Sequence, residues 1–413
     1  MIAFRLGSAR FRQSMTARHV LCVIYAIITI LLLILWFLFL EDIQDLSSFA
    51  PTYGQAKEMS YEHSDEYLRQ QGKPPTEKPY SDFGQRFMNN QNKTIDKRLN
   101  ILMLIVVQKG TDLKTYSNAL GSMKCYAQKQ GYHFKVIEDA EYPMCQQKDF
   151  MFRRHCVVLQ FLPNYDYIVF LDGDMAVVNP KRRFEEYIDP TADITFYERI
   201  DNWEFAAGSY LAKNCEWTKE FLKLFADYEQ QIPKSFHGTD NGALHIFIAE
   251  LMYPDLHEDL KTCWSVYRQS KNYDTLFTYE ACVRNVMGFR RKIENIKIME
   301  KGTSWVRDIW LTDSRWCLEK DFMLHALQQQ RRIGFQEKIL DRANMGARHL
   351  YYYDPFEKNV DWTKCEKEDF KWPLDERLIV PASTITEIIE KIKREREKKR
   401  WKFSGYVEKF IKA

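Results

Sequence analysis

The chain has 413 residues, of which 45% are hydrophobic and 15% aromatic, so it can bury a substantial core and is not a disordered protein. Its 60 Lys and Arg residues nearly balance its 57 Asp and Glu residues, giving a formal net charge of +3. This balance excludes the strongly basic field of a typical nucleic-acid-binding protein. We therefore expect a folded protein with no nucleic-acid partner.

The first 40 residues are predicted to anchor the chain in a membrane. Four arginines are the only charged residues among them, and residues 20–40 form an uninterrupted apolar run. A run of this length can cross a bilayer as a helix, whereas the apolar core of a cleaved signal peptide would be shorter and followed by small residues. Because the arginines favour the cytoplasm, we expect a cytoplasmic tail at 1–19 and the rest of the chain in the lumen or outside the cell.

Cysteine usage agrees with that topology. Eight of the nine cysteines follow the apolar run, and an even number in an oxidising compartment suggests disulfide bonds, four at most, whose pairing the spacing leaves open. No cysteine and histidine spacing matches a zinc site. The single Asn-x-Thr sequon predicts glycosylation at Asn92.

The chain after the apolar run divides into three predicted parts. Residues 41–98 are polar and show no regular spacing of apolar residues, as expected of a stem. Residues 99–380 are predicted to form the main α/β domain, and residues 381–413 a basic helical segment. Without the two basic ends, residues 41–390 carry 46 basic and 54 acidic residues, so the main domain is acidic.

The main domain begins with alternating strand and helix patterns. Residues 101–107 are continuously apolar and rich in β-branched side chains, which is typical of a strand buried on both faces. The following amphipathic stretch and second apolar run complete a βαβ unit, the opening of an α/β fold. The pattern predicts strands at 101–107, 133–137 and 167–171 and helices at 115–129, 150–162 and 215–228.

Asp172-Gly173-Asp174, directly after the strand at 167–171, is the segment most informative about chemistry. Carboxylates at positions i and i+2 of an extended chain project to one side, and the glycine between them lets a ligand approach the backbone. Parallel sheets bind ligands at the carboxyl ends of their strands. Paired carboxylates there could hold Mg²⁺ or Mn²⁺ together with the oxygens of a diphosphate. A polar turn after a core strand is the alternative interpretation.

Residues 165–174, with Asn179-Pro180 and the predicted anchor and stem, resemble the metal-dependent nucleotide-sugar glycosyltransferases of the GT-A fold. The segment is similar to the galactosyl-, mannosyl- and xylosyltransferases of yeast Golgi and plant xyloglucan type, and to a nematode family of uncharacterised predicted glycosyltransferases. Over residues 99–330, the resemblance implies a Rossmann-like α/β domain with a mixed, mainly parallel sheet flanked by helices. It also implies a Golgi or endoplasmic reticulum membrane protein with a luminal catalytic domain.

The resemblance implies a metal site and an acceptor site. His325 takes the place of the family's third metal ligand beside Asp172 and Asp174, although Lys320 replaces the family's glycine. Asp240 lies in a segment similar to the family's acidic segment facing the acceptor, and would be the catalytic residue that orients or deprotonates the acceptor hydroxyl. Gly208 and Asn241 are assigned to the acceptor side. From residue type alone, His325 could equally be a core residue and Asp240 a helix N-cap.

The remaining assignments concern the donor. Val107 and Gln108 end the first strand, where this fold usually receives the nucleoside. Gly173 would let the donor approach the two aspartates. Arg153 and Arg154, on the helix before the central strand, could contact the diphosphate, although surface arginines are common.

Three function classes follow. The main hypothesis is a glycosyltransferase that uses Mn²⁺ or Mg²⁺ to move a hexose or pentose from a nucleotide-diphosphate sugar to a glycan acceptor, with retention of configuration as the resemblance implies. An aspartate-nucleophile phosphohydrolase would use Asp172 as its nucleophile, but that fold begins at its Asp-x-Asp strand, whereas a βαβ unit precedes it here. A membrane-anchored glycan-binding protein would keep the fold without the activity.

Overall fold

The computed structural model describes residues 99–334, 351–358 and 360–411. All of them belong to one unit, Pro74–Ala413. The predicted tail, membrane anchor and stem, together with Asn92, lie outside the described residues. Within the described ranges, none of the helices combines the length and the apolar character needed to cross a bilayer.

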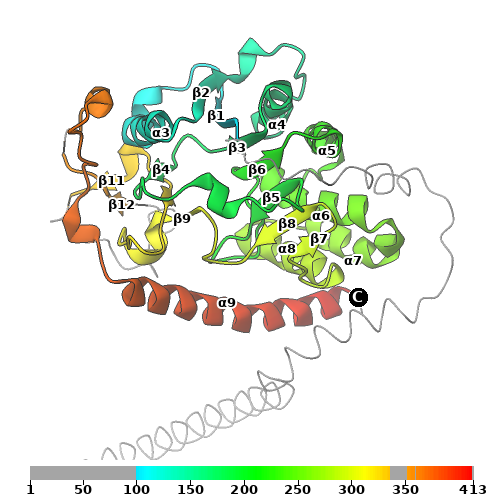
Figure 1. The fold of residues 1–413 in the computed structure, drawn as a ribbon. Coiled ribbons are helices and arrows are strands. Elements are labelled where there is room, and N and C mark those ends of the chain that lie inside the picture. The colour runs from blue at the N-terminus through cyan, green and yellow to red at the C-terminus, as the bar shows by residue number, and fades with distance from the viewer. Residues whose placement is uncertain (1–98, 335–350, 359, 412–413) are drawn as a thin grey trace, which may run out of the picture. The chain divides into compact units, whose positions relative to one another are not determined.

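A seven-stranded sheet forms the centre of the unit, in the order β2-β1-β3-β6-β5-β8-β7 (Figure 1). Both β2 and β3 are parallel to β1, and β8 is parallel to β5, while β6 is antiparallel to β3 and β5 and β7 is antiparallel to β8. Five strands therefore run in one direction, which agrees with the predicted mixed, mainly parallel sheet. The strands are β1 Ile101–Val107, β2 His133–Glu138, β3 Tyr167–Phe170, β5 Ile194–Tyr197, β6 Tyr210–Lys213, β7 Lys292–Ile293 and β8 Ile296–Met299.

Helices cover this sheet because its central strands are apolar on both faces. All seven residues of β1 are buried. Alternate residues such as Leu102 and Leu104 join a core with α4 to α8, whereas Ile101 and Met103 join a second core with α3 and the smaller sheet. The helices are α3 Ser117–Gln130, α4 Phe150–Phe161, α5 Glu216–Asp227, α6 Thr239–Met252, α7 His257–Arg268, α8 Tyr273–Val286 and α9 Ala382–Ile411.

A three-stranded sheet packs beside the main one and carries His325, one of the predicted site residues. Its order is β4-β10-β9, with β4 at Ala176–Val177, β9 at Val306–Asp308 and β10 at Met323–His325. Strand β10 is antiparallel to β4 and parallel to β9. Because β4 follows Asp174 by only two residues, this pairing brings the end of β10 to the end of β3.

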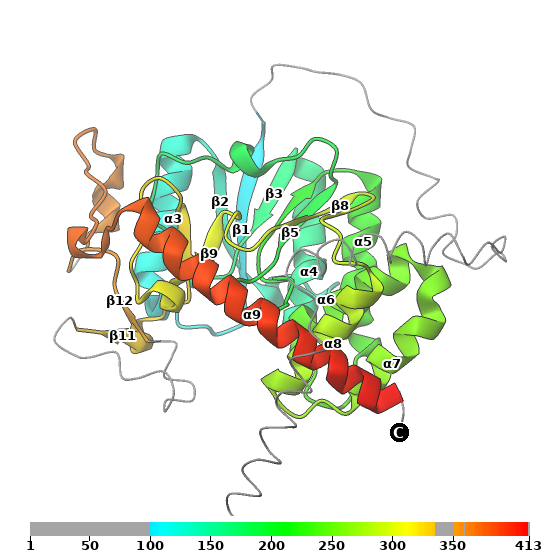
Figure 2. The same ribbon diagram turned by 90° about the horizontal axis from the view of Figure 1, so that it is seen from below.

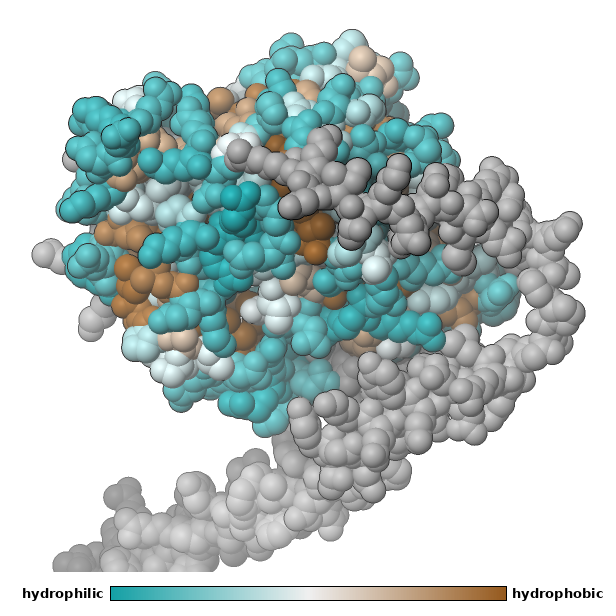
Figure 3. Space-filling view, viewed as in Figure 1, coloured by the Kyte–Doolittle hydropathy of each residue, from teal (hydrophilic) through white to brown (hydrophobic). Residues whose placement is uncertain are grey.

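The C-terminal part of the chain wraps around this framework. Strand β11 (Arg332–Ile333) pairs with β12 (Tyr352–Tyr353), and α9 then crosses the underside of the unit toward α7 and α8 (Figures 1 and 2). The predicted basic helix is part of α9, which begins at Ala382 because Ile385 and Ile389 supply a buried apolar face. The face seen in Figure 3 is mostly hydrophilic with small hydrophobic patches, as is usual for a folded domain.

The predicted βαβ unit and the following strand and helices are present, with small shifts at their ends. Residues Leu113–Tyr116 form a short 3-10 helix, so the first α-helix starts at Ser117, and it ends where Gly131 adopts a left-handed φ of 70°. Helix α4 begins after Asp149, whose side chain accepts a hydrogen bond from the backbone N–H of Met151. These caps, rather than the apolar period, set the helix bounds.

Three disulfide bonds are formed among the residues that the structure describes, one fewer than the upper limit from the cysteine count. They join Cys125 to Cys365, Cys145 to Cys156 and Cys263 to Cys282. Cys215 and Cys317 carry free thiols. The Cys125–Cys365 bond spans 240 residues and ties α3 to the 3-10 helix Trp362–Glu366, so it holds the C-terminal part of the chain on the domain.

Removing the Cys125–Cys365 bond should therefore destabilise the domain. The variant Cys125→Ser/Cys365→Ser is expected to lower the free energy of unfolding by roughly 2–5 kcal/mol, because the unfolded chain loses the constraint of a long closed loop. Urea denaturation under non-reducing conditions measures this change. Cys215→Ser, which removes a free thiol, is the control and should unfold at nearly the wild-type urea concentration. Equal effects of the two variants would contradict the assignment.

Candidate metal centre

Asp172 and Asp174 lie just beyond the carboxyl end of β3. The strand runs through the buried core, and Leu171 extends it by a backbone hydrogen bond to Leu104 of β1. The chain then turns, with the N–H of Met175 donating to the carbonyl of Asp172 over 3.2 Å. The side chain of Asp172 is 28% exposed and that of Asp174 is 12% exposed. Both carboxylates are therefore partly open at the strand-end edge predicted from the sequence.

His325, the last residue of β10, lies against both carboxylates. Its Nε2 is 3.1 Å from Oδ1 of Asp174 and 3.8 Å from Oδ2 of Asp172. One ligand atom from each of the three residues lies within 4.8 Å of the others. Two carboxylate oxygens and an imidazole nitrogen at this spacing are a donor set that a divalent cation could take. The structure thus brings together the three residues that the resemblance assigned to the metal.

The charges of the three groups shift their pKa values strongly. Burial alone would lower the pKa of His325, but the charge of Asp174 and the hydrogen bonds to Asp174 and Asp308 raise it to about 10. Burial opposes the ionisation of Asp174, yet His325 and the amide of Gln328 lower its pKa to about 2. Burial and the neighbouring charge of Asp174 raise the pKa of Asp172, although Arg154 acts in the opposite direction. The site is thus a place where two carboxylates require positive charge.

Arg154 of α4 supplies positive charge from the other side of Asp172. Its Nη1 donates to Oδ1 of Asp172 over 2.6 Å, and its Nε donates to Oδ2 of Asp240 over 3.1 Å. His155 also contacts Asp240, with 3.0 Å between Nε2 and Oδ2, while its Nδ1 lies 3.1 Å from the hydroxyl of Tyr210. Arg154 therefore bridges the metal-site aspartate to a buried acidic residue on α6.

Asp240 occupies a different environment from that expected of a catalytic base. Its side chain is only 1% exposed. Burial raises the pKa of the carboxyl, but Arg154 and the hydrogen bond from His155 outweigh that effect and lower it to about 2. A carboxylate held by two donors in the core is a weak proton acceptor. In this geometry Asp240 anchors Arg154.

Arg153, one of the two arginines assigned to the diphosphate, is turned away from this cluster. Its Nη1 is 2.7 Å from Oδ2 of Asp139, and its Nε donates to the carbonyl of Gln147 over 2.7 Å. The neighbouring Arg154 is the one that reaches Asp172. Arg154 and His155 lie among the buried positions of α4 together with Phe152 and Val158, so the packing of α4 distinguishes the two arginines.

The residues assigned to the nucleoside lie at one end of β1. Val107 is buried and Gln108 is exposed. A methyl group added to Gly173 would lie 3.8 to 4.0 Å from atoms of Ile105, Val107 and Tyr116, so Gly173 faces the end of β1. Val107, Gln108 and Gly173 therefore share the edge of the sheet that carries the two aspartates.

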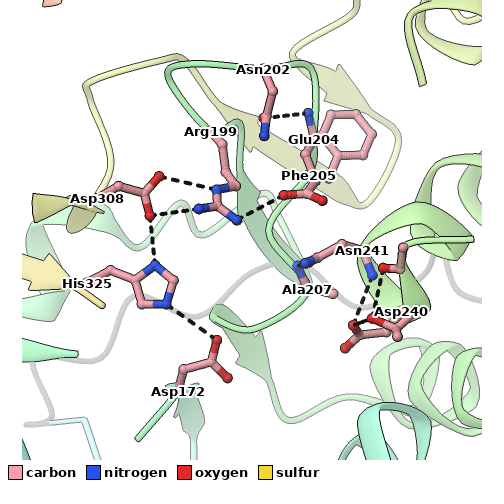
Figure 4. A network of polar contacts seen from close by, with 12 residues as sticks. Asp172, Arg199, Asn202, Glu204, Phe205, Ala207, Asp240, Asn241, Asp308 and His325 are labelled. Atoms are coloured by element: carbon pink, nitrogen blue, oxygen red, sulfur yellow. Dashed lines mark hydrogen bonds and ion pairs between the residues drawn. The ribbon is translucent and has the colours of Figure 1, made fainter. Parts of the chain in front are cut away.

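Gly208 and Asn241, assigned to the acceptor side, have structural contacts with the site. A Cβ on Gly208 would lie 2.1 Å from Oδ2 of Asp172, so only glycine leaves room for this carboxylate. The side-chain oxygen of Asn241 accepts a hydrogen bond of 2.8 Å from the N–H of Ala207 (Figure 4). Asn241 thus ties the start of α6 to the segment that carries Gly208.

Sequence reasoning missed three further residues around Asp174. The amide of Gln328 donates to Oδ2 of Asp174 over 2.8 Å. The charge of Arg331 helps to lower the pKa of Asp174, and no carboxylate among the described residues pairs with it. Burial and the charge of Asp174 raise the pKa of Tyr116. No local motif marks these residues, because Gln328 and Arg331 reach the site through the chain path after His325 and Tyr116 through the 3-10 helix after β1.

Comparison with protein-family models places the sequence in one family. Residues 123–341 match the family described as "Protein of unknown function, DUF273", a match that covers more than half of the chain. The chain belongs to this family. The matched range includes the two aspartates, Gly208, Asp240 and His325, so the candidate metal centre lies inside the family region. No curated protein matches the sequence.

Several solved structures show a distant likeness to this family member. A glycosyltransferase involved in glycosylation of the major capsid of PBCV-1 is 12% identical, with 56% of this chain and 95% of that chain covered and a TM-score of 0.36. The apo-form glycosyltransferase GlyE of Streptococcus pneumoniae TIGR4 is 13% identical, with coverage of 67% and 66% and a TM-score of 0.30. Mouse xyloside xylosyltransferase 1 is 14% identical, with coverage of 51% and 87% and a TM-score of 0.27. Scores this low carry no function over to this chain.

The space at Gly208 offers a test of the metal centre. Gly208→Ala should push the carboxylate of Asp172 out of position, because its Cβ would overlap Oδ2. We expect the affinity for Mn²⁺ to fall by about 10-fold or more, as measured by the electron paramagnetic resonance signal of free Mn²⁺. Gly173→Ala, where the added methyl group meets only ordinary contacts, should bind Mn²⁺ as the wild type does. Unchanged affinity in Gly208→Ala would contradict this geometry.

The Asp240 environment predicts a pH dependence of stability. The pKa of about 2 in the folded state lies below the ordinary value of about 3.9, so the stabilisation is present above pH 4 and is lost as the pH falls toward 2. Asp240→Asn should be less stable than the wild type, and this gap should narrow by about 1 kcal/mol between pH 5 and pH 3. Urea denaturation at both pH values measures the gap. A constant gap would contradict the lowered pKa.

Proposed function

We propose that the protein is a metal-dependent glycosyltransferase that moves a hexose or pentose from a nucleotide-diphosphate sugar to a glycan acceptor. The observation that carries this proposal is the convergence of Asp172, Asp174 and His325 at the carboxyl edge of a parallel strand, beside Arg154. Such an edge is where open α/β sheets bind nucleotide ligands. Two carboxylates and one imidazole leave further coordination positions of an octahedral cation for diphosphate oxygens.

The chemistry explains why such a donor needs this site. Breaking the bond between sugar and diphosphate leaves negative charge on the diphosphate, and a bound Mn²⁺ or Mg²⁺ would stabilise that charge as a Lewis acid. Asp172, Asp174 and His325 are the residues that would hold the ion. The hard oxygen and imidazole donors favour Mn²⁺ or Mg²⁺ over metals that prefer thiolates.

Two arginines of the chain, Arg154 and Arg331, add positive charge beside Asp172 and Asp174. Arg154 keeps Asp172 in place by the contact of 2.6 Å and so fixes one side of the donor site. Arg331 lies near Asp174 without a carboxylate partner among the described residues, so its guanidinium can bind phosphate oxygens. Arg331, rather than Arg153, is the proposed diphosphate ligand, because Arg153 is paired with Asp139.

The nucleoside and the acceptor are assigned to opposite sides of the aspartates. Val107, Gln108, Gly173 and Tyr116 surround the end of β1 and would border the nucleoside. Asp240 contributes by anchoring Arg154, and Gly208 and Asn241 keep the acceptor side of Asp172 clear. Retention of configuration is part of the proposal through the resemblance of the Asp172–Asp174 segment to retaining enzymes.

The proposed setting is the Golgi or endoplasmic reticulum membrane, with the catalytic domain in the lumen. The apolar run at 20–40 and the arginines before it support an anchor of this orientation. Three disulfide bonds support an oxidising compartment. Glycosylation of Asn92 in the stem belongs to the same proposal.

A donor screen tests the function. The full-length protein in detergent, supplied with Mn²⁺ and a panel of nucleotide sugars, is expected to release nucleotide from one of them. Asp172→Asn and Asp174→Asn should each lower that rate by about 100-fold or more, because the transition-state charge loses its metal-based stabilisation. Asp361→Asn, at an exposed aspartate far along the chain, is the matched control and should keep full activity.

Two results would overturn the proposal. Hydrolysis of phosphate esters without turnover of any nucleotide sugar would favour the phosphohydrolase. Binding of glycans with no turnover of nucleotide sugars by the wild type would favour the non-catalytic glycan-binding protein. In both cases the aspartates would need another explanation.

A further inference from the structure

Asp308, the last residue of β9, lies directly behind the proposed metal ligand His325. The register of β9 and β10 places these two residues side by side, and 2.8 Å separate Oδ1 of Asp308 from Nδ1 of His325 (Figure 4). Asp308 is buried and approaches neither Asp172 nor Asp174 in any described contact. It therefore contacts the imidazole from the side opposite to the two carboxylates.

This contact determines what the imidazole can do. A carboxylate at Nδ1 accepts a hydrogen bond, so Nδ1 carries the hydrogen and Nε2 is left facing Asp172 and Asp174. Histidines that bind metals in proteins usually donate their other N–H to a carboxylate or carbonyl, which sets the ring orientation and increases the basicity of the ligating nitrogen. The Asp308–His325 pair has this arrangement.

Arg199 in turn holds Asp308 from its far side. The Nη2 of Arg199 donates to Oδ1 of Asp308 over 2.8 Å, and its Nε donates to Oδ2 over 3.2 Å. The remaining nitrogen, Nη1, donates to Glu204 over 3.0 Å, and the guanidinium lies over the ring of Trp310. A forked contact of this kind restricts a carboxylate in both position and rotation.

The segment that carries Arg199 is itself held by hydrogen bonds in its turn and near its C-terminal end. It connects β5 to β6, and its turn is closed by a hydrogen bond of 3.1 Å from the N–H of Glu204 to the side chain of Asn202. Farther along, Ala207 binds Asn241 at the start of α6. Figure 4 shows this segment running from Asp308 and His325 on one side to Asp240 and Asn241 on the other. The orientation of His325 is thereby coupled to the packing of α6.

On the basis of the proposed metal-dependent function, we propose that Asp308 is a positioning residue that orients His325 for the divalent ion, with Arg199 holding Asp308 in place. Asp308 does not touch the ion or the substrate in this account. Its effect passes through the imidazole, so the loss should appear first in metal affinity.

A neighbouring ion pair provides a control for a purely structural role. Arg307 and Asp321 form a buried pair with 2.6 Å between Nε and Oδ1, and Arg307 is adjacent to Asp308 on β9. Asp321 also accepts from the N–H of Cys317, and it makes no described contact with the metal residues. Asp321→Ala should therefore destabilise the domain, as loss of a buried partner does, and should leave Mn²⁺ affinity unchanged.

The test measures Mn²⁺ binding by the full-length protein, with electron paramagnetic resonance for the affinity and circular dichroism for the fold. Asp308→Ala is expected to weaken Mn²⁺ binding by about 10- to 100-fold. Asp308→Asn keeps an oxygen that can accept from Nδ1 and should limit the loss to less than about 10-fold. Asp308→Ala leaves Arg199 with only Glu204 as a carboxylate partner, so Asp308→Ala/Arg199→Met/Glu204→Gln removes all three charges and should show the same weakening in a folded protein.

Each result has a definite meaning. Wild-type affinity in a folded Asp308→Ala or Asp308→Ala/Arg199→Met/Glu204→Gln variant would overturn the positioning role and leave the proposed function intact. Equal weakening in Asp321→Ala would also overturn it, because the loss would then follow stability alone. A wild-type protein that binds no Mn²⁺ would overturn the proposed metal-dependent function, and this inference with it.

Discussion

Two carboxylates in one partly buried volume repel each other and lose hydration, so they need positive partners. Asp172 and Asp174 impose this constraint at the end of β3, and the surrounding structure satisfies it from two sides. Arg154 approaches Asp172 from α4, and His325 approaches both aspartates from β10. An arrangement that concentrates negative charge and then partly balances it is suited to a divalent cation with an anionic ligand.

The main sheet and the small sheet each position one of these partners. The main sheet ends β3 at an open edge, with α4 packed so that Arg154 points to that edge. The small sheet brings in residues from far along the chain, because β10 pairs with β4 on one side and with β9 on the other. The connection between β5 and β6 then links the back of His325 to the start of α6. The candidate metal centre therefore depends on parts of the chain that only tertiary structure joins.

Local sequence signals predicted the βαβ unit, the central strand and the position of the two aspartates, because continuous apolar runs and a strand-end motif are short-range features. His325 was reached only through a family motif. Arg199 and Asp308 are 109 residues apart, and no local pattern indicates that they meet. Helix α6 is buried on most sides, so it lacks the amphipathic period that predicted α5. The choice of Arg154 over Arg153 depended on which side of α4 faces the core.

A crystal structure of the full-length protein with Mn²⁺ and a nucleoside diphosphate, collected at the manganese absorption edge, tests the central claim most directly. The account predicts one anomalous peak within about 2.0–2.4 Å of an oxygen of Asp172, an oxygen of Asp174 and Nε2 of His325, with diphosphate oxygens completing the coordination. An ion bound elsewhere, or a nucleotide bound without any ion at these three residues, would contradict it.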